Sequence, residues 1–425
     1  MAHSGTTAPE PGADERPAPS PRALDLLGAH EFRRVYLAVA VSRLGDAFHY
    51  VALMWVALVA GGPLGVLAVR MADSLPALVF GFHGGLVADR RSRRRMMVEA
   101  DLARAALLVP VAAGALTGHL PLWALVAAAF LLTAAASYFE PAYGAIVPSL
   151  VGRAHVQQAN ALVQTTADVV SMLGWAASAA LLTVLPLGGL FALDAASFLV
   201  SAALLAGIAE RKGAVSTGTE RPRLREGFAA LAGHRTLAVG IAALGVAVTI
   251  SAGTWIVGVP ELVRSDLGRG AGSFSLVAAA YAAGSIAAGV ALARRPVARK
   301  ALGSLLAWTL YLPAYGLFAF ADSLGLALAG GAVAGLAQTT AILLLTSSAQ
   351  AVVPDRFLGR VMGLIALVHR SAHASGLLLV SPLFALLAPG TVFAAAAVAL
   401  PLVGIAGALV ALRGFVGAQP GRTTT

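Results

Sequence analysis

A set of polar side chains recurs at helical spacing within the first long apolar segment. It consists of Arg43, Asp46, His49 and Tyr50, which fall within an arc of about 120° on a helix that turns 100° per residue. Burial in an apolar segment favours the neutral form of a carboxyl group, whereas a nearby arginine favours its charged form. We therefore predict proton uptake and release at Asp46, with the other three side chains lining a substrate cavity. The alternative is that Arg43 simply neutralises Asp46.

Two further acids, Asp73 and Asp168, also fall near the middle of apolar segments. Arg70 lies three residues before Asp73, and this spacing allows an ion pair within one helix. The same spacing separates Asp101 from Arg104. Asp168 has no cation at this spacing, so we predict it as the alternative proton carrier, with Asp73 as a third candidate.

A cluster of basic residues lies in a late apolar segment. The stretch VHRSAH contains His369, Arg370 and His373. Two histidines four residues apart can bind a metal ion, but Arg370 stands where the zinc protease motif has glutamate, so we predict no metal site. We expect instead a positive cluster that holds an anionic group of a substrate, or that reaches Asp46 or Asp168 across a cavity.

These side chains must be positioned by membrane-spanning helices. Apolar residues make up 58% of the 425-residue chain and charged residues only 12%, whereas soluble domains are about 45–50% apolar. From Val35 onward the chain contains successive apolar runs of about 20 residues, enough to cross a hydrocarbon core of about 30 Å. We predict twelve transmembrane helices, at residues 35–60, 65–88, 96–117, 120–139, 158–185, 188–209, 236–259, 272–293, 301–320, 324–349, 358–387 and 391–412.

The composition also excludes several classes of function. The formal net charge is +10, but the arginines separate apolar runs and do not line a polar domain, so we expect no nucleic-acid partner. The absence of cysteine excludes disulfides, thiolate metal sites and cysteine nucleophiles. The chain has no GxxxxGK[ST] sequence, so we expect no direct ATP drive. Its loops are too short for a catalytic domain, so we predict no enzyme activity and no cofactor.

The distribution of basic residues predicts the orientation of the chain. Most of the 30 Lys and Arg residues fall in the tails and in alternate loops, whereas the opposite loops contain Arg264 and Arg269. Because positive loops stay in the cytoplasm, both termini are predicted to be cytoplasmic, in a multi-pass protein of the cell membrane. The first 30 residues are rich in Pro, Ala, Ser and Gly, which is typical of a disordered tail and not of a signal peptide.

Two pairs of similar segments indicate an internal duplication. The segment GLVADRRSRRR at 85–95 aligns with GVALARRPVARK at 289–300, and AIVPSLVGR at 145–153 aligns with AVVPDRFLGR at 351–360. The predicted fold is therefore all-α, with twelve transmembrane helices in two pseudo-symmetric six-helix bundles. The predicted units are a disordered cytoplasmic tail (1–30), an N-terminal bundle (31–209), a cytoplasmic connector (210–235), a C-terminal bundle (236–413) and a C-terminal tail (414–425).

The linker at 85–95 also resembles a known motif. Its pattern Gly-x-x-x-Asp-Arg-x-x-Arg-Arg is similar to motif A of the major facilitator superfamily, which lies between the second and third of twelve helices. Ser92 stands where a second glycine is usual. The residues that match the motif are Gly85, Asp89, Arg90, Arg93 and Arg94.

Further segments resemble the branch of this superfamily that contains macrolide-efflux and enterobactin-exporter-like proteins. They are the first predicted helix and the stretches FEPAYGAIVPSLVGRAHVQQANAL, GLFALDAASFLVSAALL and VVPDRFLGRVMGL. The resemblance covers about residues 31–413. It implies a secondary transporter with alternating access, which in that branch is usually an exporter driven by protons.

We therefore expect a monomer in the lipid bilayer that couples proton movement to the export of amphipathic small molecules, such as a drug, an antibiotic, a natural product or a siderophore. Two departures leave an importer or facilitator of a small metabolite as the alternative. Trp175 stands where the antiporter motif of the fifth helix has proline. The predicted fourth helix also lacks the arginine that many drug antiporters carry there.

The short linker is a candidate gate on the cytoplasmic side. Asp89 is the predicted latch, and its partner is either Arg360 or the first amide groups of the helix that begins near Leu358. An acid among five arginines adds nothing to the charge bias that sets topology. The alternative for the linker arginines is that they only anchor the loop and bind anionic lipid headgroups.

Overall fold

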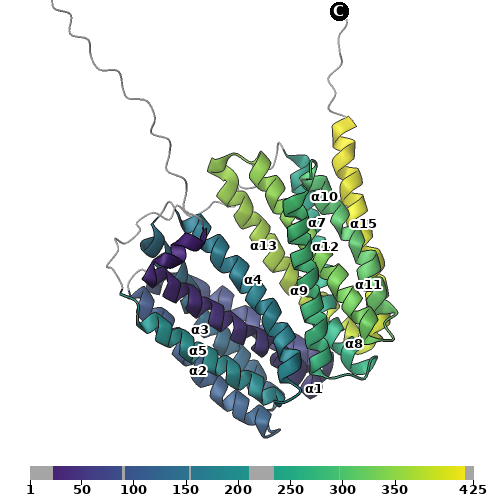
Figure 1. Ribbon diagram of the computed structural model, residues 1–425. Helices are drawn as coiled ribbons and strands as arrows, with labels where there is room; N and C mark the ends of the chain where they lie inside the picture. Colours follow the sequence, from purple (N-terminus) through teal and green to yellow (C-terminus); the bar gives the residue numbers. More distant parts are fainter. Residues whose placement is uncertain (1–22, 89–90, 153–154, 210–233, 296, 417–425) are drawn as a thin grey trace, which may run out of the picture.

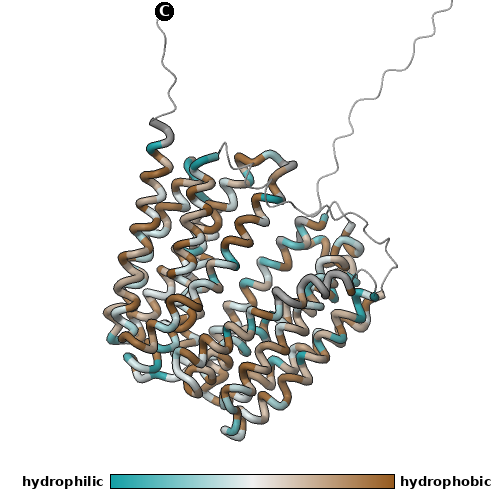
Figure 2. Tube along the Cα trace, turned by 180° about the vertical axis from the view of Figure 1, so that it is seen from behind, coloured by the Kyte–Doolittle hydropathy of each residue, from teal (hydrophilic) through white to brown (hydrophobic). Residues whose placement is uncertain are grey.

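The computed structural model describes residues 23–88, 91–152, 155–209, 234–295 and 297–416, and this part of the chain is helical and contains no strand. Within these ranges, nine helices are long and apolar enough to cross a membrane. Apolar residues predominate along the helices (Figure 2). The predicted class, an all-α membrane protein, is therefore confirmed.

The helices of the first half of the chain pack against one another on one side of the molecule (Figure 1). Helix α1 contacts α3, α4 and α5, and α2 contacts α3 and α5. These elements are a short 3-10 helix η1 at Ala23–Gly28, α1 at His30–Ala88, α2 at Arg93–Leu116, α3 at Leu122–Val151, α4 at Val156–Leu181 and α5 at Leu187–Ala206.

The second half forms a second group of helices, in which α9 packs on α12, α7 on α13 and α11 on α15. Helix α4 lies along α9 and joins the two groups. The elements are α7 at Arg235–Gly253, a π-helical turn η3 at Thr254–Gly258, α8 at Val259–Ser265, α9 at Ala271–Arg294, α10 at Lys300–Ala307, η4 at Trp308–Leu310, α11 at Tyr311–Ala319, α12 at Leu324–Val352, α13 at Asp355–Val380, α14 at Leu383–Leu386 and α15 at Pro389–Val416.

The structure corrects three predicted boundaries. The tail predicted for residues 1–30 is wrong at its end, because η1 packs Leu26 into a buried cluster with Phe32 at the start of α1. The fourth predicted helix, 120–139, is too short, because α3 continues through Glu140 to Val151. The C-terminal tail predicted from residue 414 begins too early, because α15 extends to Val416. The predicted connector lies outside the described residues except for residues 234 and 235.

The two aligned prolines of the predicted duplication occupy different places in their helices. Pro148 lies inside α3, and its carbonyl oxygen accepts a hydrogen bond from the Gly152 amide at the end of that helix. Pro354 instead precedes α13 as its N-cap residue. The superposition of the two halves, with Gly85 on Gly289, stays a prediction.

Close approach of α9 and α12 depends on small residues. A Cβ atom on Gly335 would clash with the carbonyl oxygen of Tyr281, and one on Gly284 would clash with that of Ala332. The Ser285 hydroxyl donates to the Gly335 carbonyl oxygen at 3.2 Å. Membrane helices lack a hydrophobic driving force toward each other, so small residues that bring backbones together supply much of the packing energy. This contact fixes the position of Tyr281.

Helix α1 contains the first two predicted spans, and it breaks between them at Gly62. This residue has φ of 60° and ψ of −156°, which is not a helical conformation, and Pro63 follows it. Proline has no amide proton to continue the helical hydrogen bonds. The positive φ together with an extended ψ is a region that essentially only glycine occupies. The direction in which the chain leaves the first span therefore depends on Gly62.

We expect Gly62→Ala to destabilise the protein by about 1–3 kcal/mol, because a Cβ atom makes this backbone conformation strained. The control is Gly144→Ala, since Gly144 lies inside α3 and a Cβ atom there meets no atom within 4 Å. Thermal unfolding of the purified variants in detergent measures the effect. Equal melting temperatures for the two variants would show that the break at Gly62 is not needed.

Candidate functional site

The polar residues at the start of α1 form an ion-pair network that reaches α3. Arg43 Nη1 lies 3.5 Å from Asp46 Oδ2, and Arg43 Nη2 lies 3.4 Å from Glu140 Oε1. The Asp46 side chain is 38% exposed. One arginine is thus shared by two acids, and neither contact is short. Glu140 was not a candidate from the sequence, because it falls after the end of the predicted fourth helix.

One turn further along α1, His49 contacts another acid, Asp194. Its Nδ1 atom lies 3.2 Å from Asp194 Oδ2 on α5, and the Asp194 side chain is only 2% exposed. Gly45 makes this contact possible, because a Cβ atom at that position would lie 2.5 Å from Asp194 Oδ1 and would clash with Ser197. The sequence candidates did not include Asp194. Its position inside an apolar run could have indicated it, because a buried acid is costly unless it has a partner or a function.

The Arg70 and Asp73 pair expected from the sequence forms with short contacts. Arg70 Nη1 lies 2.6 Å from Asp73 Oδ2, and the Thr133 hydroxyl of α3 donates to Asp73 Oδ1 at 2.5 Å. Both oxygens of this carboxylate therefore have a donor. A proton on Asp73 would have to displace one of these two contacts.

The expected pair of Asp101 and Arg104 also forms and is buried within the first half. The Asp101 side chain is fully buried and accepts a hydrogen bond from the Ser201 hydroxyl at 2.6 Å. The Arg104 guanidinium lies 4.1 Å from the centre of the Phe198 ring and 4.9 Å from that of Phe139. A cation over an aromatic face is attracted by the ring electrons. The cluster therefore ties α2 to α3 and α5.

Asp168 lies on an exposed face of α4, where it accepts a hydrogen bond from Gln164 Nε2 at 2.9 Å. It forms no ion pair with another described residue. The histidines and the arginine of α13 do not reach Asp46 or Asp168 in the described part of the chain, so the predicted bridge across a cavity is absent there.

A cavity of about 330 Å³ lies inside the second half, between α7, α9, α11, α12 and α13. Its lining contains both aromatic and polar side chains. The rings of Trp255 and Tyr281 lie 4.4 Å apart. The Tyr311 hydroxyl donates to Gln338 Oε1 at 2.7 Å. His369 and His373 also line this cavity, whereas the predicted third member of their cluster, Arg370, is exposed and does not line it.

Trp255 lies in the π-helical turn η3, which follows α7 directly. The turn shifts the register of the helix by one residue, and α8 begins directly after it with Pro260 as its second residue. Such π-helical turns are rare and are frequent at functional sites. The turn was not predicted from the sequence, because a π-helical turn has no simple hydrophobic period.

Tyr50 lies at the boundary between the two groups of helices. Its ring centre is 5.9 Å from that of Trp175 on α4 and 6.1 Å from that of Phe274 on α9. The Trp175 indole nitrogen is a buried hydrogen-bond donor without a partner among the described residues.

The residues of the predicted gate are only partly within the described part of the chain. Asp89 and Arg90 lie outside it, and Gly85 falls near the end of α1. The expected contact between Asp89 and Arg360 therefore stays a prediction. The Arg360 guanidinium lies 5.6 Å from the centre of the Phe357 ring.

Two other arginines of the motif hold helix ends together. Arg93 Nη1 donates to the Ala145 carbonyl oxygen of α3 at 3.0 Å, and Arg94 Nη1 donates to the Ile208 carbonyl oxygen after α5 at 3.0 Å. Ile208 follows the end of α5, whereas Ala145 lies within the last two turns of α3. These two side chains thus fix the beginning of α2 against its neighbours.

The helical membrane architecture and its internal cavity are features of a transporter. Residues 23–420 match the family of transmembrane secretion effectors. The chain belongs to this family of MFS transporters. The family and the similar solved structures are transporters and not enzymes.

The curated relatives are distant. The chain is 26% identical to the uncharacterized MFS-type transporter YvqJ of Bacillus subtilis, over 65% of this chain and 68% of that protein. It is 28% identical to macrolide efflux protein A of Enterococcus faecalis, over 30% of this chain and 40% of the relative. A macrolide efflux protein A of Streptococcus pyogenes is 26% identical over 39% of this chain and 41% of the relative. The chain thus spans less than half the length of the macrolide efflux proteins that it matches.

Solved structures share the fold at low sequence identity. The nucleoside transporter NupG is 12% identical and has a TM-score of 0.65, with 91% of this chain and 100% of that chain covered. A bacterial homologue of the iron transporter ferroportin in an inward-facing state is 17% identical and has a TM-score of 0.64, with 91% and 99% covered. These likenesses establish the fold alone.

The buried Asp101 and Arg104 pair generates a prediction about stability. Arg104→Gln should destabilise the protein by about 3–5 kcal/mol, because it leaves a buried carboxylate without its cation. The double variant Asp101→Asn with Arg104→Gln should recover most of this loss, since it leaves no unpaired charge. Melting temperatures in detergent measure both variants. A double variant as unstable as the single one would show that the contacts of Arg104 with the aromatic rings matter more than the ion pair.

Proposed function

We propose that the protein is a proton-coupled exporter of amphipathic small molecules that works by alternating access. It acts as a monomer in the cell membrane with both termini in the cytoplasm. The observation that carries this proposal is the aromatic and polar cavity of the second half, in a transporter family that contains relatives named for macrolide efflux.

The proposed architecture has twelve transmembrane helices in two six-helix bundles, at residues 31–209 and 236–413, joined by the connector at 210–235. The length of α1 supports the count. Its 59 residues would span about 90 Å, three times the hydrocarbon core, so the chain must turn back at the break. Helix α1 counts once among the nine candidate membrane helices of the described ranges, and it counts twice when it is divided at the break. Adding α2 and α4 then gives twelve.

The chemistry of the cavity supports an amphipathic substrate. Ligand sites are mostly apolar, with a few polar groups that fix orientation, and about 300–1,000 Å³ is their usual size. The rings of Trp255 and Tyr281 offer flat apolar surface, while Gln338 and the two histidines offer hydrogen bonds.

Asp46 is the best-placed proton carrier among the acids of the membrane segments. Asp73 has two short contacts, and Asp101 is fully buried beside its arginine. Asp46 is instead partly exposed, and Arg43, the cation in its ion pair, is shared with Glu140. A change in the position of Arg43 would therefore alter the charge state of Asp46. Asp168, which has no cation partner among the described residues, is the alternative carrier.

The pair formed by His49 and Asp194 extends the proposed proton site from Asp46 toward the interior of the first half. His49 lies three residues after Asp46 on the same face of α1, and Asp194 is almost completely buried behind it. A proton taken up at the partly exposed Asp46 could pass inward to this pair. Histidine suits such a relay because its two ring nitrogens can bind and release protons separately.

For the gate, we retain Asp89 as the acid that holds the cytoplasmic side closed, with Arg360 or the N-terminal amides of α13 as its partner. The contacts of Arg93 and Arg94 with the ends of neighbouring helices support a gate that moves as one rigid piece. Short segments of this kind let packed helices shift together.

The cavity generates a prediction about substrate affinity. Trp255→Ala should raise the KM for export about two- to tenfold, because it removes one aromatic stacking surface. Trp255→Phe should restore most of the affinity. The control is Trp123→Ala, since the Trp123 side chain is 75% exposed on the outer surface. Transport of a labelled macrolide and of a panel of amphipathic dyes, measured in cells without other efflux pumps, gives the values. An unchanged KM for Trp255→Ala would remove this cavity as the substrate site.

The proposed coupling generates a second prediction. Asp46→Asn keeps the size of the side chain but cannot titrate, so it should abolish uphill transport driven by a proton gradient, while exchange of substrate at equal pH survives. Proteoliposomes with an imposed pH gradient measure both activities. The matched control is Asp322→Asn, because Asp322 lies between α11 and α12 and outside the acid network.

Uphill transport by Asp46→Asn with unchanged pH dependence would show that Asp46 is not the coupling residue, and the same test would then be made on Asp168. Net accumulation inside cells by the unmodified protein would contradict export and favour an importer.

A further inference from the structure

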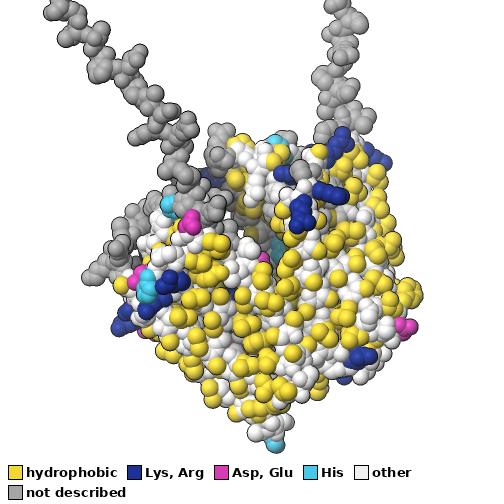
Figure 3. All heavy atoms as spheres, in the orientation of Figure 1, with side chains coloured by type: hydrophobic (Ala, Val, Ile, Leu, Met, Phe, Trp, Pro, Cys, Tyr) yellow, Lys and Arg dark blue, Asp and Glu magenta, His cyan; other side chains and the backbone are white. Residues whose placement is uncertain are grey.

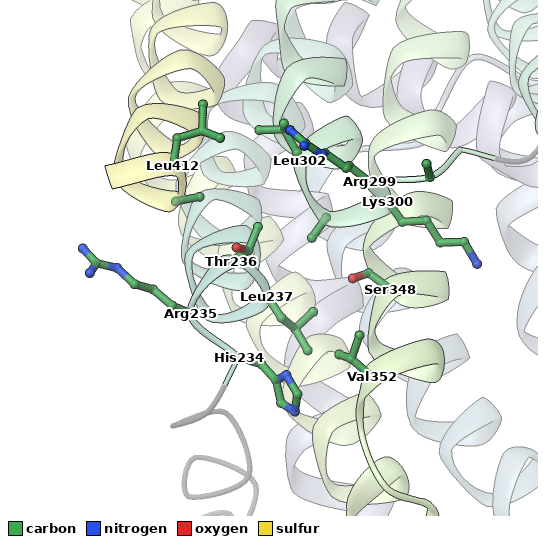
Figure 4. Close-up of a pocket in the computed structure, with 13 residues that line it drawn as sticks. His234, Arg235, Thr236, Leu237, Arg299, Lys300, Leu302, Ser348, Val352 and Leu412 are labelled. Carbon is green, nitrogen blue, oxygen red and sulfur yellow. The ribbon is translucent and has the colours of Figure 1, made fainter. Parts of the chain in front are cut away.

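A second and larger cavity lies at one end of the second half, far along the helices from the aromatic cavity. It measures about 590 Å³ and lies between the beginnings of α7 and α10 and the ends of α12 and α15 (Figure 4). Its lining combines basic side chains, apolar side chains and hydroxyl groups. The basic residues are His234, Arg235, Arg299 and Lys300.

Among the described side chains, no acid pairs with the positive charge around this cavity. Neither Arg235, Arg299 nor Lys300 forms an ion pair with a described residue. Three acids of the second half have described side chains, namely Glu261, Asp266 and Asp322, and they follow the far ends of α7 and α11. Figure 3 shows the basic side chains gathered at one end of the second half, above a broad apolar surface.

The helix dipoles do not explain why cations gather here. Arg235 is the first residue of α7 and Lys300 is the first residue of α10, and a cation is disfavoured at the N-terminus of its own helix. The ends of α12 and α15 at the same cavity have the opposite dipole, so the helix ends largely cancel. An anion in the cavity would therefore be attracted mainly by the basic side chains.

A largely buried serine also lines this cavity. Ser348 of α12 is only 6% exposed, and its side chain has no hydrogen bond to a described residue. In Figure 4 its oxygen points into the space between α7 and α12. The hydroxyl thus opens onto the cavity, where it can bond to water or to a ligand. The first turns of α7 and α10 have no side-chain cap, so their amide groups are further donors for an oxyanion.

The apolar part of the lining indicates what the anion is attached to. Leu302, Val352 and Leu412 line the same cavity as the basic groups, and the last two are partly exposed on the outer surface of the helices. A free phosphate ion would make no favourable contact with these apolar side chains. An amphiphile with a phosphate at its head and hydrocarbon chains below would contact both kinds of side chain.

We propose that this cavity binds the headgroup phosphate of an anionic phospholipid, with Arg235, Arg299 and Ser348 as its ligands and with the acyl chains against Leu302 and Leu412. Basic cavities between membrane helices at the cytoplasmic surface are suited to such headgroups. Arg235 and Lys300 extend outward on opposite sides in Figure 4. Their long side chains can turn toward a bound phosphate.

The test measures lipid binding by the full-length protein in neutral detergent, with native mass spectrometry and thermal stability as readouts. Three probes are compared, namely phosphatidylglycerol, phosphatidylcholine with the same acyl chains, and inorganic phosphate. We expect retention of phosphatidylglycerol and a raised melting temperature with it, and neither effect with phosphatidylcholine or inorganic phosphate.

The variants separate this cavity from a general attraction to basic surface. Arg235→Gln with Arg299→Gln should weaken phosphatidylglycerol binding by about 30-fold, because each basic residue near an anionic surface contributes a factor of about five. The matched control is Arg294→Gln with Arg295→Gln, which removes two arginines at the end of α9, outside the cavity, and should leave binding within about twofold. Ser348→Ala removes only the hydroxyl donor and should weaken binding about two- to tenfold.

Equal losses in the two double variants would show only diffuse attraction and would overturn the proposal. Displacement of phosphatidylglycerol by millimolar inorganic phosphate would also overturn it, because the site would then bind a free phosphate compound. If the double variant in the cavity does not fold, unchanged binding by Ser348→Ala would contradict the assignment.

Discussion

The cost of placing a charge inside an apolar helix is the constraint on which the rest of this structure depends. Each charged side chain in a membrane segment must find a partner, reach water or exchange a proton. The first half shows the range of solutions. Asp101 is buried with an arginine and a serine, Asp73 has a donor on each oxygen, and Asp46 keeps one long contact and partial exposure. The contacts of Asp101 and Asp73 are thus typical of a structural role, whereas those of Asp46 leave room for the proton exchange that we propose.

Small residues make these partnerships possible, because they set how closely two helices approach. Gly45 lets α1 come near enough to α5 for His49 to reach Asp194. On the other side of α1, a Cβ atom on Gly174 would lie 2.6 Å from the Cβ atom of Ala47, so α4 packs equally tightly. Substitution of either glycine would change electrostatics as well as packing. In a membrane protein electrostatics and packing are coupled, because a small shift of one helix moves the partner of an ion pair away and leaves a charge without compensation.

The sequence predicted the helical membrane class and the ion pairs within one helix, because both depend on local composition and on a spacing of three residues. It did not predict the contacts between helices. Glu140 was missed because α3 continues past the expected end of the apolar run, through two prolines. Asp194 was missed because its partner lies 145 residues away on another helix. The cavity with His369 and His373 could not be predicted in shape, since it depends on the π-helical turn that carries Trp255.

The proposed proton-coupled exporter must transmit a proton event in one half to a substrate in the other, and α1 contacts both halves. It carries Asp46 and His49, and it also contacts α8, α9 and α13 of the second half. Tyr50, next to His49, packs on Phe274 of α9 through a ring contact, which has no strict direction and can slide. A movement of α1 that follows protonation would therefore change the packing between the halves.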